Sequence, residues 1–296
     1  MRHLKLILST ALFLFTLLLS AKMKEYTLEE CVLIALEKNI SIQQSELDVS
    51  SAEIDKDDAF GSFLPRVNAQ SQHIWNNGLS QNITNGLIEN LTTQFSSFGG
   101  NVGVTLFNGR QNVNQLSRAN LNLLARQYQL ENMKDDVSLF VANAYLQVMF
   151  NRELDQVQRY QLELAKQELQ RTQLSIEAGI LTAAELFEIE ANIAAQEQAV
   201  IQAENAYRLS RISLAQLLLI TDYENFDIAK EDFDIPFSEI LNETPKDIFE
   251  KALTLRNDIK FGITNIEIAE KDIDLAKGAT MPTLSAFYNY NTRISY

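Results

Sequence analysis

The stretch Gln111–Glu177 decides the fold; it begins QNVNQLSRANLNLLARQYQL and ends QELQRTQLSIE. No proline interrupts it, and its apolar residues recur at seven-residue steps. They form two series, Leu116, Leu123, Leu130, Val137 and Ala144, then Val141, Val148, Leu162, Leu169 and Ile176, with Asp155 as the one polar position of the second series. A strict seven-residue repeat keeps one face of a helix against a partner only when the helices supercoil left-handedly. We therefore predict one coiled-coil helix, about 100 Å long at ~1.5 Å per residue.

The partner helix follows directly in the chain. The segment Ala178-Gly179-Ile180-Leu181-Thr182 interrupts the pattern, which then resumes up to Ile220. The second arm carries Leu186, Ile193, Val200, Tyr207 and Leu214. Gly179 suits the left-handed position that ends many helices. Thr182 and Glu185 form a capping-box pattern, which predicts that Thr182 begins the return helix. Residues 110–220 are thus predicted to be one long antiparallel helical hairpin.

The corner of this hairpin has two interpretations. It is either a simple connection between two helices or a docking surface, because Ile180 and Leu181 place apolar side chains at the end of a long rod. The residues alone leave both open. The candidate docking site comprises Gly179, Ile180, Leu181 and Thr182.

The N-terminus has the pattern of an export signal. Arg2 and Lys5 precede an apolar run from Leu6 to Leu19, and the small residues Ser20-Ala21 follow it. A charged start, a short apolar run and a small-residue exit are typical of a secretory signal, and the run is short for a membrane span. Residues 1–21 are predicted to be a signal peptide, with an uncleaved anchor as the alternative.

Between the signal and the hairpin, residues 22–64 are predicted to hold one helix. Thr27 and Glu30 form a capping box at its start, and Gly61 and Pro65 end it. The sequence therefore predicts that this helix leads directly into the next segment, where the period changes.

Residues 65–109 alternate polar and apolar positions with a period of two, which predicts strands. The first strand is expected to turn at Asn76-Asn77-Gly78, and a polar loop is expected over residues 79–93. The second strand is expected to end at Asn108-Gly109, with Val102, Val104 and Leu106 on one side and Asn101, Gly103, Thr105 and Phe107 on the other. An isolated hairpin is marginal in water, so this one needs a larger sheet, a partner chain or a membrane. Alternation in segments of about ten residues is a weak indication of outer-membrane strands.

Three segments follow the long hairpin. Residues 221–243 are acidic and mixed, and we interpret them as a compact connector. Residues 244–281 are predicted to hold a helix that starts with Thr244 as N-cap and Pro245 at the first helical position. Residues 282–296 are predicted to begin another strand.

An internal repeat is the strongest signal in the sequence. A shift of 217 positions carries Thr27 onto Thr244 and brings identical residues together without a gap. The helix-stop residues coincide as well, since Gly61 falls on Gly278 and Pro65 falls on Pro282. A period this long is not that of a solenoid. It indicates two duplicated halves, of which the second is cut short, so the chain is expected to be a fragment.

Composition excludes several classes of function. The formal net charge of −14 argues against a nucleic-acid partner, which requires a basic surface. The single cysteine, Cys31, allows no internal disulfide, and the two histidines form no zinc-binding cluster. No pattern of catalytic residues or cofactor-binding loop occurs, so we expect neither an enzyme nor a cofactor.

Four motifs in order resemble one family, the TolC-like outer membrane efflux proteins. They are Tyr26-Thr27-Leu28-Glu29-Glu30-Cys31-Val32 with Ala35-Leu36 and Asn39, then Leu64-Pro65, then Leu106-Phe107-Asn108-Gly109, then Ala178-Gly179-Ile180-Leu181-Thr182 with Glu185-Leu186. Each motif is weak alone, but their order, spacing and duplication are together specific. The resemblance covers nearly everything after the signal.

The resemblance implies a mainly α fold with a β-hairpin. A long antiparallel coiled-coil helical hairpin would be combined with outer-membrane β-barrel strands in duplicated halves, as a trimeric α/β-barrel channel. It implies a homotrimer in the cell outer membrane, in contact with outer membrane lipid and extending into the periplasm. A periplasmic adaptor (a membrane fusion protein) and an inner-membrane pump would complete the export system. The hairpin corner at Gly179–Thr182 would dock the adaptor.

The chain departs from the family pattern at three points. Ile40 follows Asn39 where the family often has proline, and Glu185 stands where it often has aspartate. Most of the second half is absent from this sequence, so no residue that narrows the periplasmic entrance is carried over. The alternative function is a periplasmic adaptor-type coiled-coil protein of an efflux pump.

Overall fold

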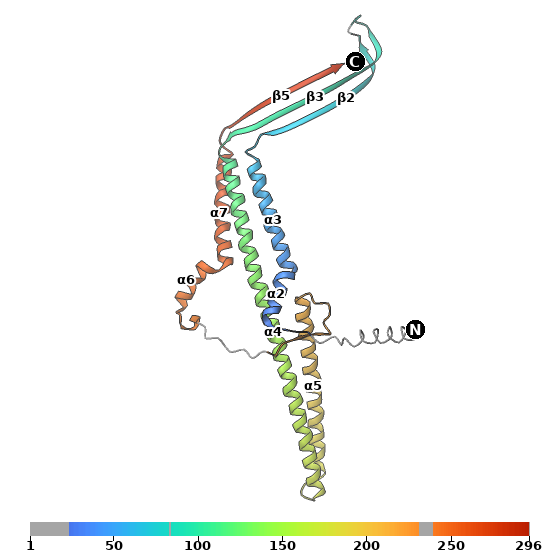
Figure 1. Cartoon of the computed structure of the whole chain (residues 1–296), viewed down its shortest axis with the longest axis vertical. Coiled ribbons are helices and arrows are strands. Elements are labelled where there is room, and N and C mark those ends of the chain that lie inside the picture. Colours follow the sequence, from blue (N-terminus) through green and yellow to red (C-terminus); the bar gives the residue numbers. More distant parts are fainter. Residues whose placement is uncertain (1–23, 83, 231–238, 296) are drawn as a thin grey trace, which may run out of the picture. The chain divides into compact units, whose positions relative to one another are not determined.

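The computed structural model describes residues 24–82, 84–230 and 239–295, and the chain divides into two compact units (Figure 1). The first unit comprises Met1–Gln44 and Glu131–Thr244, and the second comprises Ser45–Leu130 and Pro245–Tyr296. The predicted signal peptide lies outside the described residues. Within the described ranges, no helix combines the length and apolar character that a membrane-spanning helix requires.

The predicted helical hairpin is confirmed. Helix α4 (Gln111–Glu177) has the predicted bounds, and α5 (Ala184–Leu217) ends three residues before Ile220. In the first unit the two helices lie side by side in opposite directions (Figure 1). Every apolar position of the seven-residue series is buried or half-buried, as a coiled-coil seam requires.

Polar contacts across the seam fix the register of α4 against α5. The Asn151 side-chain amide, on a residue only 8% exposed, donates a hydrogen bond of 3.2 Å to the carbonyl of Ala206. Arg159 reaches Glu204 at 3.2 Å, but both side chains are largely exposed. Exposed ion pairs of this kind stabilise a fold by about 0–1 kcal/mol, so the buried seam and Asn151 contribute more.

The predicted single helix of residues 22–64 is wrong in one respect. The chain forms α2 (Leu28–Lys38) and α3 (Ile40–Gly61), which are separated at Asn39 by an extended backbone with a ψ of 127°. The capping box of Thr27 and Glu30 is confirmed at the start of α2. The Asn39 side chain stabilises the break, since its oxygen accepts a hydrogen bond of 2.9 Å from the N–H of Ser41 at the start of α3. Helix propensity alone did not predict this break.

The second copy of this segment breaks at the same place. The predicted helix of residues 244–281 is α6 (Pro245–Leu255) followed by α7 (Asn257–Gly278), with a ψ of 129° at Arg256. The shift that carries Thr27 onto Thr244 also carries each bound of α2 and α3 onto the matching bound of α6 and α7. The internal repeat is therefore a structural repeat.

The second unit contains an antiparallel sheet in the order β2-β3-β5, formed by β2 (Arg66–Gln81), β3 (Ile88–Asn108) and β5 (Thr283–Ser295). The expected turn at residues 76–78 is wrong, since β2 continues to Gln81, and the expected loop of residues 79–93 is shorter than predicted, since β3 begins at Ile88. Asn76 pairs with Thr93 and Asn77 with Thr92, so ladder hydrogen bonds outweigh the weak strand propensity of asparagine. The chain reverses later, beside Gly86 with a φ of 75°.

The connector of residues 221–243 contains a strand that periodicity could not reveal. Strand β4 (Phe226–Ile228) pairs in parallel with β1 (Lys24–Tyr26), and a short 3-10 helix η1 (Glu239–Asn242) follows. Phe226 and Ile228 are each 1% exposed, and the rings of Tyr26 and Phe226 lie 5.3 Å apart. Three residues are too few for an alternation to be recognised. Residues 231–238 lie outside the described part.

Side chains of α4 and α5 attach this small parallel sheet to the helical hairpin. The Tyr145 hydroxyl lies 3.3 Å from the Tyr26 carbonyl, and an Arg152 guanidinium N–H donates to the Ile228 carbonyl at 3.0 Å. The Tyr207 hydroxyl donates to the Asp227 carboxylate at 2.6 Å. These bonds give hydrogen-bond partners to two backbone carbonyls and one carboxylate of the small sheet, so these oxygens do not depend on water for a partner.

A pH prediction follows from Tyr207. Burial, reinforced by the hydrogen bond to Asp227, raises the pKa of Tyr207 to about 12. An unfolded tyrosine has a pKa of about 10, so folding favours the neutral phenol. The contribution of the Tyr207 hydroxyl to the free energy of unfolding is therefore fully present below about pH 10, and it is lost as the pH rises through about 12. We expect Tyr207→Phe to melt at a lower temperature than wild type at pH 8, with a smaller further decrease between pH 10 and 12. The melting temperatures of both proteins would be measured by circular dichroism. Equal decreases for the two proteins between pH 10 and 12 would contradict this prediction.

Candidate functional site

Surfaces are the candidate functional features of the described residues. In residues 24–82, 84–230 and 239–295, no group of histidine, cysteine, aspartate or glutamate could hold a metal ion. Two surfaces stand out, namely the corner of the helical hairpin and the two faces of the three-stranded sheet.

The corner of the hairpin is a Schellman motif. The N–H of Ile180 bonds the Ser175 carbonyl at 2.9 Å, and the N–H of Gly179 bonds the Ile176 carbonyl at 2.9 Å. Gly179 has a φ of 74°, which confirms the predicted left-handed position. A Cβ atom there would meet nothing within 4 Å. Glycine is therefore required by the backbone conformation and not by lack of space.

The predicted capping box at Thr182 is wrong. Helix α5 begins at Ala184, its N-cap is Ala183, and no side chain caps it. The contact between Glu185 and Thr182 is a backbone hydrogen bond of 3.2 Å. The side chain of Thr182 does not cap α5, because the helix begins one residue later than the pattern suggested and alanine stands at the N-cap position.

The corner leaves apolar surface exposed. Ile180 is 75% exposed, and Leu181 beside it is half-buried. In many Schellman motifs the residue at the Ile180 position packs back on the helix, but here its side chain remains in solvent. The structure places the four candidate docking residues on one turn at the end of the hairpin.

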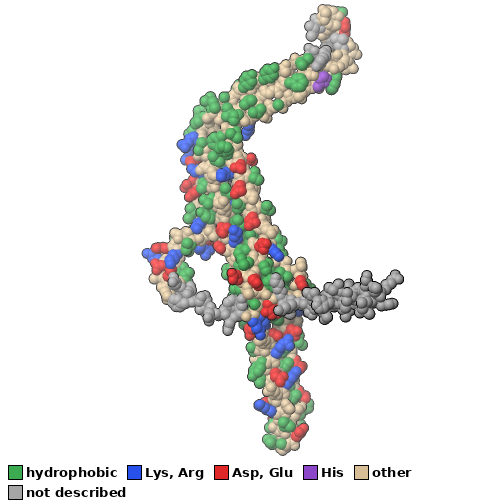
Figure 2. All heavy atoms as spheres, viewed as in Figure 1, with side chains coloured by type: hydrophobic (Ala, Val, Ile, Leu, Met, Phe, Trp, Pro, Cys, Tyr) green, Lys and Arg blue, Asp and Glu red, His purple; other side chains and the backbone are tan. Residues whose placement is uncertain are grey.

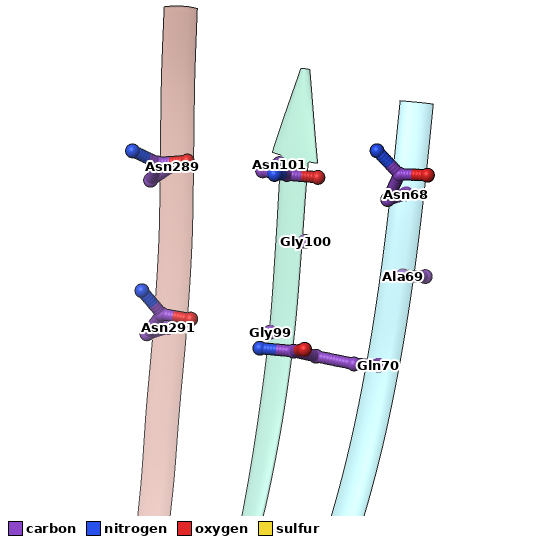
Figure 3. A pocket seen from close by; sticks show the side chains of 8 residues that line it. All are labelled: Asn68, Ala69, Gln70, Gly99, Gly100, Asn101, Asn289 and Asn291. Carbon is purple, nitrogen blue, oxygen red and sulfur yellow. The ribbon is translucent and has the colours of Figure 1, made fainter. Parts of the chain in front are cut away.

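The sheet has a polar face. Its residues lie in register across β2, β3 and β5 as the rows Arg66-Gly103-Phe287, Asn68-Asn101-Asn289, Gln70-Gly99-Asn291 and Gln72-Ser97-Arg293. Most of the polar side chains in these rows are primary amides, and those of the two middle rows surround a shallow hollow over Gly99 (Figure 3). A Cβ atom at Gly99 would come within 2.5 Å of the Asn291 side-chain oxygen, so the Asn291 side chain could not keep its present position beside a larger residue.

The opposite face, which we call the apolar face, carries aliphatic and aromatic side chains. Its rows are Val67-Val102-Tyr288, Ala69-Gly100-Tyr290, Ser71-Phe98-Thr292 and His73-Ser96-Ile294, followed by Trp75-Gln94. Val67 is 72% exposed, Tyr288 68% and Trp75 65%. The predicted alternation holds as far as Thr105. It then breaks, because Leu106 forms a bulge opposite β5.

Charge is distributed unevenly along the chain. Figure 2 shows lysine, arginine, aspartate and glutamate side chains gathered over the helices and few of them over the strands, whereas hydrophobic side chains lie over both. An exposed apolar surface of this extent usually marks contact with a membrane or a protein. The sheet therefore differs chemically from the helical parts of the same chain.

Two glycines join the sheet to its helices. Gly109, at the end of β3, has a φ of 64°, and a Cβ atom there would overlap the carbonyl oxygen of Gly278. A Cβ atom on Gly278 would in turn lie 2.7 Å from the Gly109 carbonyl oxygen. The sequence marked both residues as element ends but did not show that their backbones touch. The pairing of Gly99 with Gln70 and Asn291 was also not predicted.

Comparisons with known proteins agree with this architecture. A family model described as outer membrane efflux protein matches residues 33–218. No curated protein matches the chain by sequence. The solved structure of CusC is similar with a TM-score of 0.73 and 17% identity over 92% of this chain. The Campylobacter jejuni CmeC outer membrane channel gives 0.75 and 15% over 90%, and VceC of Vibrio cholerae gives 0.73 and 14% over 91%.

The chain spans 61% of the length of CusC and of CmeC and 67% of the length of VceC. At these identities the likeness establishes the fold, which is mainly helical with a minor part in strands. The duplicated helices, the long hairpin and the amphipathic sheet are all parts of that fold.

Proposed function

Because this chain belongs to the outer membrane efflux protein family, we propose that the whole protein is the outer-membrane channel of a tripartite export system. It would be a passive conduit for small molecules or proteins across the outer membrane and the periplasm, with energy supplied by an inner-membrane pump. The observation that carries this proposal is the sheet, whose one face is apolar and exposed and whose other face is polar.

The apolar face has the height of a membrane band. From Val104 to Gln94 a strand extends about 34 Å at ~3.4 Å per residue, which gives about 25 Å after the tilt of ~40° that outer-membrane barrels adopt. Trp75 and His73 lie toward one end of this band, with their rings 4.0 Å apart. Aromatic side chains are typical of the membrane–water boundary. The polar face would then line the aqueous interior.

The sheet needs further strands to close. In the described residues, β2 and β5 each pair only with β3, which leaves two open edges. Open edges are not tolerated within a bilayer. We infer that strands from further copies of the protein close the barrel, as a homotrimer would allow.

The helices also leave surface for neighbouring copies. In the first unit α4 exposes apolar side chains away from its seam with α5, at Leu139, Phe140, Leu146, Phe150, Val157 and Tyr160. Phe140 and Phe150 are each 63% exposed. A helix in the wall of a tube packs against two neighbours, which explains apolar residues on more than one of its faces.

The corner at Gly179–Thr182 is proposed as the docking site for a periplasmic adaptor. The exposed Ile180 supports this, because a simple turn has no need of an apolar side chain in solvent. One such contact is small, so several copies around a ring would be needed for useful avidity. The adaptor-type alternative for the chain itself gains no support from the family match.

Conductance tests the proposed conduit. The purified full-length protein, inserted into a planar lipid bilayer without any energy source, is expected to give discrete steps of ion current. An adaptor-type protein has no closed barrel and would give none. Protein that is demonstrably in the bilayer but never conducts would contradict the proposal.

A further inference from the structure

The polar face is positively charged, although the chain as a whole is acidic. The whole sequence has 39 acidic residues against 25 lysines and arginines. The rows of the polar face carry two charges, Arg66 and Arg293, and both are positive. Glu89 is the one carboxylate in β2, β3 and β5 together, and it lies at the far end of the hairpin. There it is bonded to Asn85 at 3.0 Å.

The hollow over Gly99 is lined by primary amides, which can both donate and accept hydrogen bonds. Its volume is 290 Å³, and it lies among Asn68, Gln70, Asn101, Asn289 and Asn291, whose side chains come from three adjacent strands (Figure 3). Each primary amide offers two N–H donors. Glycine at position 99 keeps the floor open, since a Cβ atom there would overlap the Asn291 side chain.

Arg293 adds a fixed positive charge next to this hollow. Its guanidinium carbon lies 3.7 Å from the centroid of the Phe95 ring, which is the geometry of a cation–π contact. A second hollow of 570 Å³ joins Gln70, Gln72 and Asn291 to Arg293. Arginine presents five N–H donors and keeps its charge at any physiological pH.

From this arrangement we propose that the polar face favours anions, so that the barrel section of the channel preferentially passes anionic solutes. The hollow over Gly99 would be a transient site for their carboxylate, sulfonate or phosphate groups. This inference rests on the proposed function, because it requires the polar face to line an aqueous passage. In a trimer each arginine would be present three times around that passage.

Thiol-modification rates test the local potential independently of any constriction elsewhere in the channel. In the full-length protein in outer-membrane vesicles, Cys31→Ala removes the native thiol and Asn101→Cys places one thiol between the rows of Arg66 and Arg293. The rates of an anionic sulfonatoethyl and a cationic trimethylammonioethyl methanethiosulfonate are then compared, each relative to its rate with free mercaptoethanol.

The anionic reagent is expected to be favoured at low salt by about fivefold, as two unit charges several ångströms away imply. Arg66→Gln combined with Arg293→Gln should return the ratio to that of the free thiol. Lys246→Gln removes an equally positive charge from α6, at a side chain that is 83% exposed, and should leave the ratio unchanged. A ratio at or below that of the free thiol, or one that the double arginine variant does not alter, overturns the inference.

A thiol on the opposite face separates this inference from the proposed function. Ala69→Cys, on the apolar face, is expected to react with neither reagent in vesicles because lipid covers it. If the Ala69→Cys protein reacted as fast as the Asn101→Cys protein, that result would contradict membrane insertion and so both proposals. A reactive thiol at position 101 without preference for the anion would overturn only the anion inference.

Discussion

Replacing Ile180 by aspartate is expected to abolish export by cells that depend on the full-length protein, while its amount in the outer membrane stays unchanged. The side chain is 75% exposed, and the turn is held by backbone hydrogen bonds, so the fold does not need it. Loss of one buried isoleucine contact costs about 2 kcal/mol. Repeated in each copy of a ring, this loss would prevent docking of the adaptor.

Matched variants separate docking from folding. Leu181→Asp should have the same effect, but Gly179→Trp is a poorer test because any L-residue is strained at a φ of 74°. Gln198→Asp introduces the same charge at an exposed position of α5 and should leave export normal. Normal export by both Ile180→Asp and Leu181→Asp would remove the docking proposal and leave the corner as a simple turn.

The second large effect is expected at the junction of sheet and helices. Gly109→Val should destabilise the protein by about 3 kcal/mol, which combines the cost of a left-handed residue with that of overpacking. The new Cβ atom would overlap the Gly278 carbonyl oxygen and would lie 2.7 Å from the Cβ of Met281. Neither atom can move away easily, since one is backbone and the other is the first atom of its side chain.

Thermal unfolding of the purified protein, followed by circular dichroism, measures this effect. A loss of this size corresponds to a decrease of about 5 °C in Tm for a chain of this length. Gly103→Val is the matched control, because Gly103 lies in the same strand and a Cβ atom there meets nothing within 4 Å. Equal melting temperatures for the two variants would show that the contact between Gly109 and Gly278 is not a close one.

Local signals in the sequence predicted much of this fold. The seven-residue repeat predicted both bounds of α4, because a coiled-coil seam leaves its period in the chain over many turns. Gly179 marked the corner, since only glycine adopts its conformation without strain. The duplication predicted where α6 begins and where β5 begins.

Features that depend on contacts between distant segments could not be predicted. The breaks at Asn39 and Arg256 occupy single residues, and no proline follows either one. Strands β1 and β4 have three residues each and are about 200 positions apart. The hollow over Gly99 exists only because the register sets Gln70 and Asn291 on either side of it. The candidate docking residues were predicted as a group at the end of the hairpin, but no pattern in the chain predicted that Ile180 is 75% exposed while Leu181 is half-buried.

The mass and location of the full-length protein test the central proposal most directly. Outer membranes would be separated from inner membranes and periplasm, extracted with mild detergent, and the protein mass measured by light scattering with the detergent contribution subtracted. The proposed channel predicts a particle of three copies in the outer-membrane fraction. Recovery of the protein as a soluble monomer from the periplasm would contradict it.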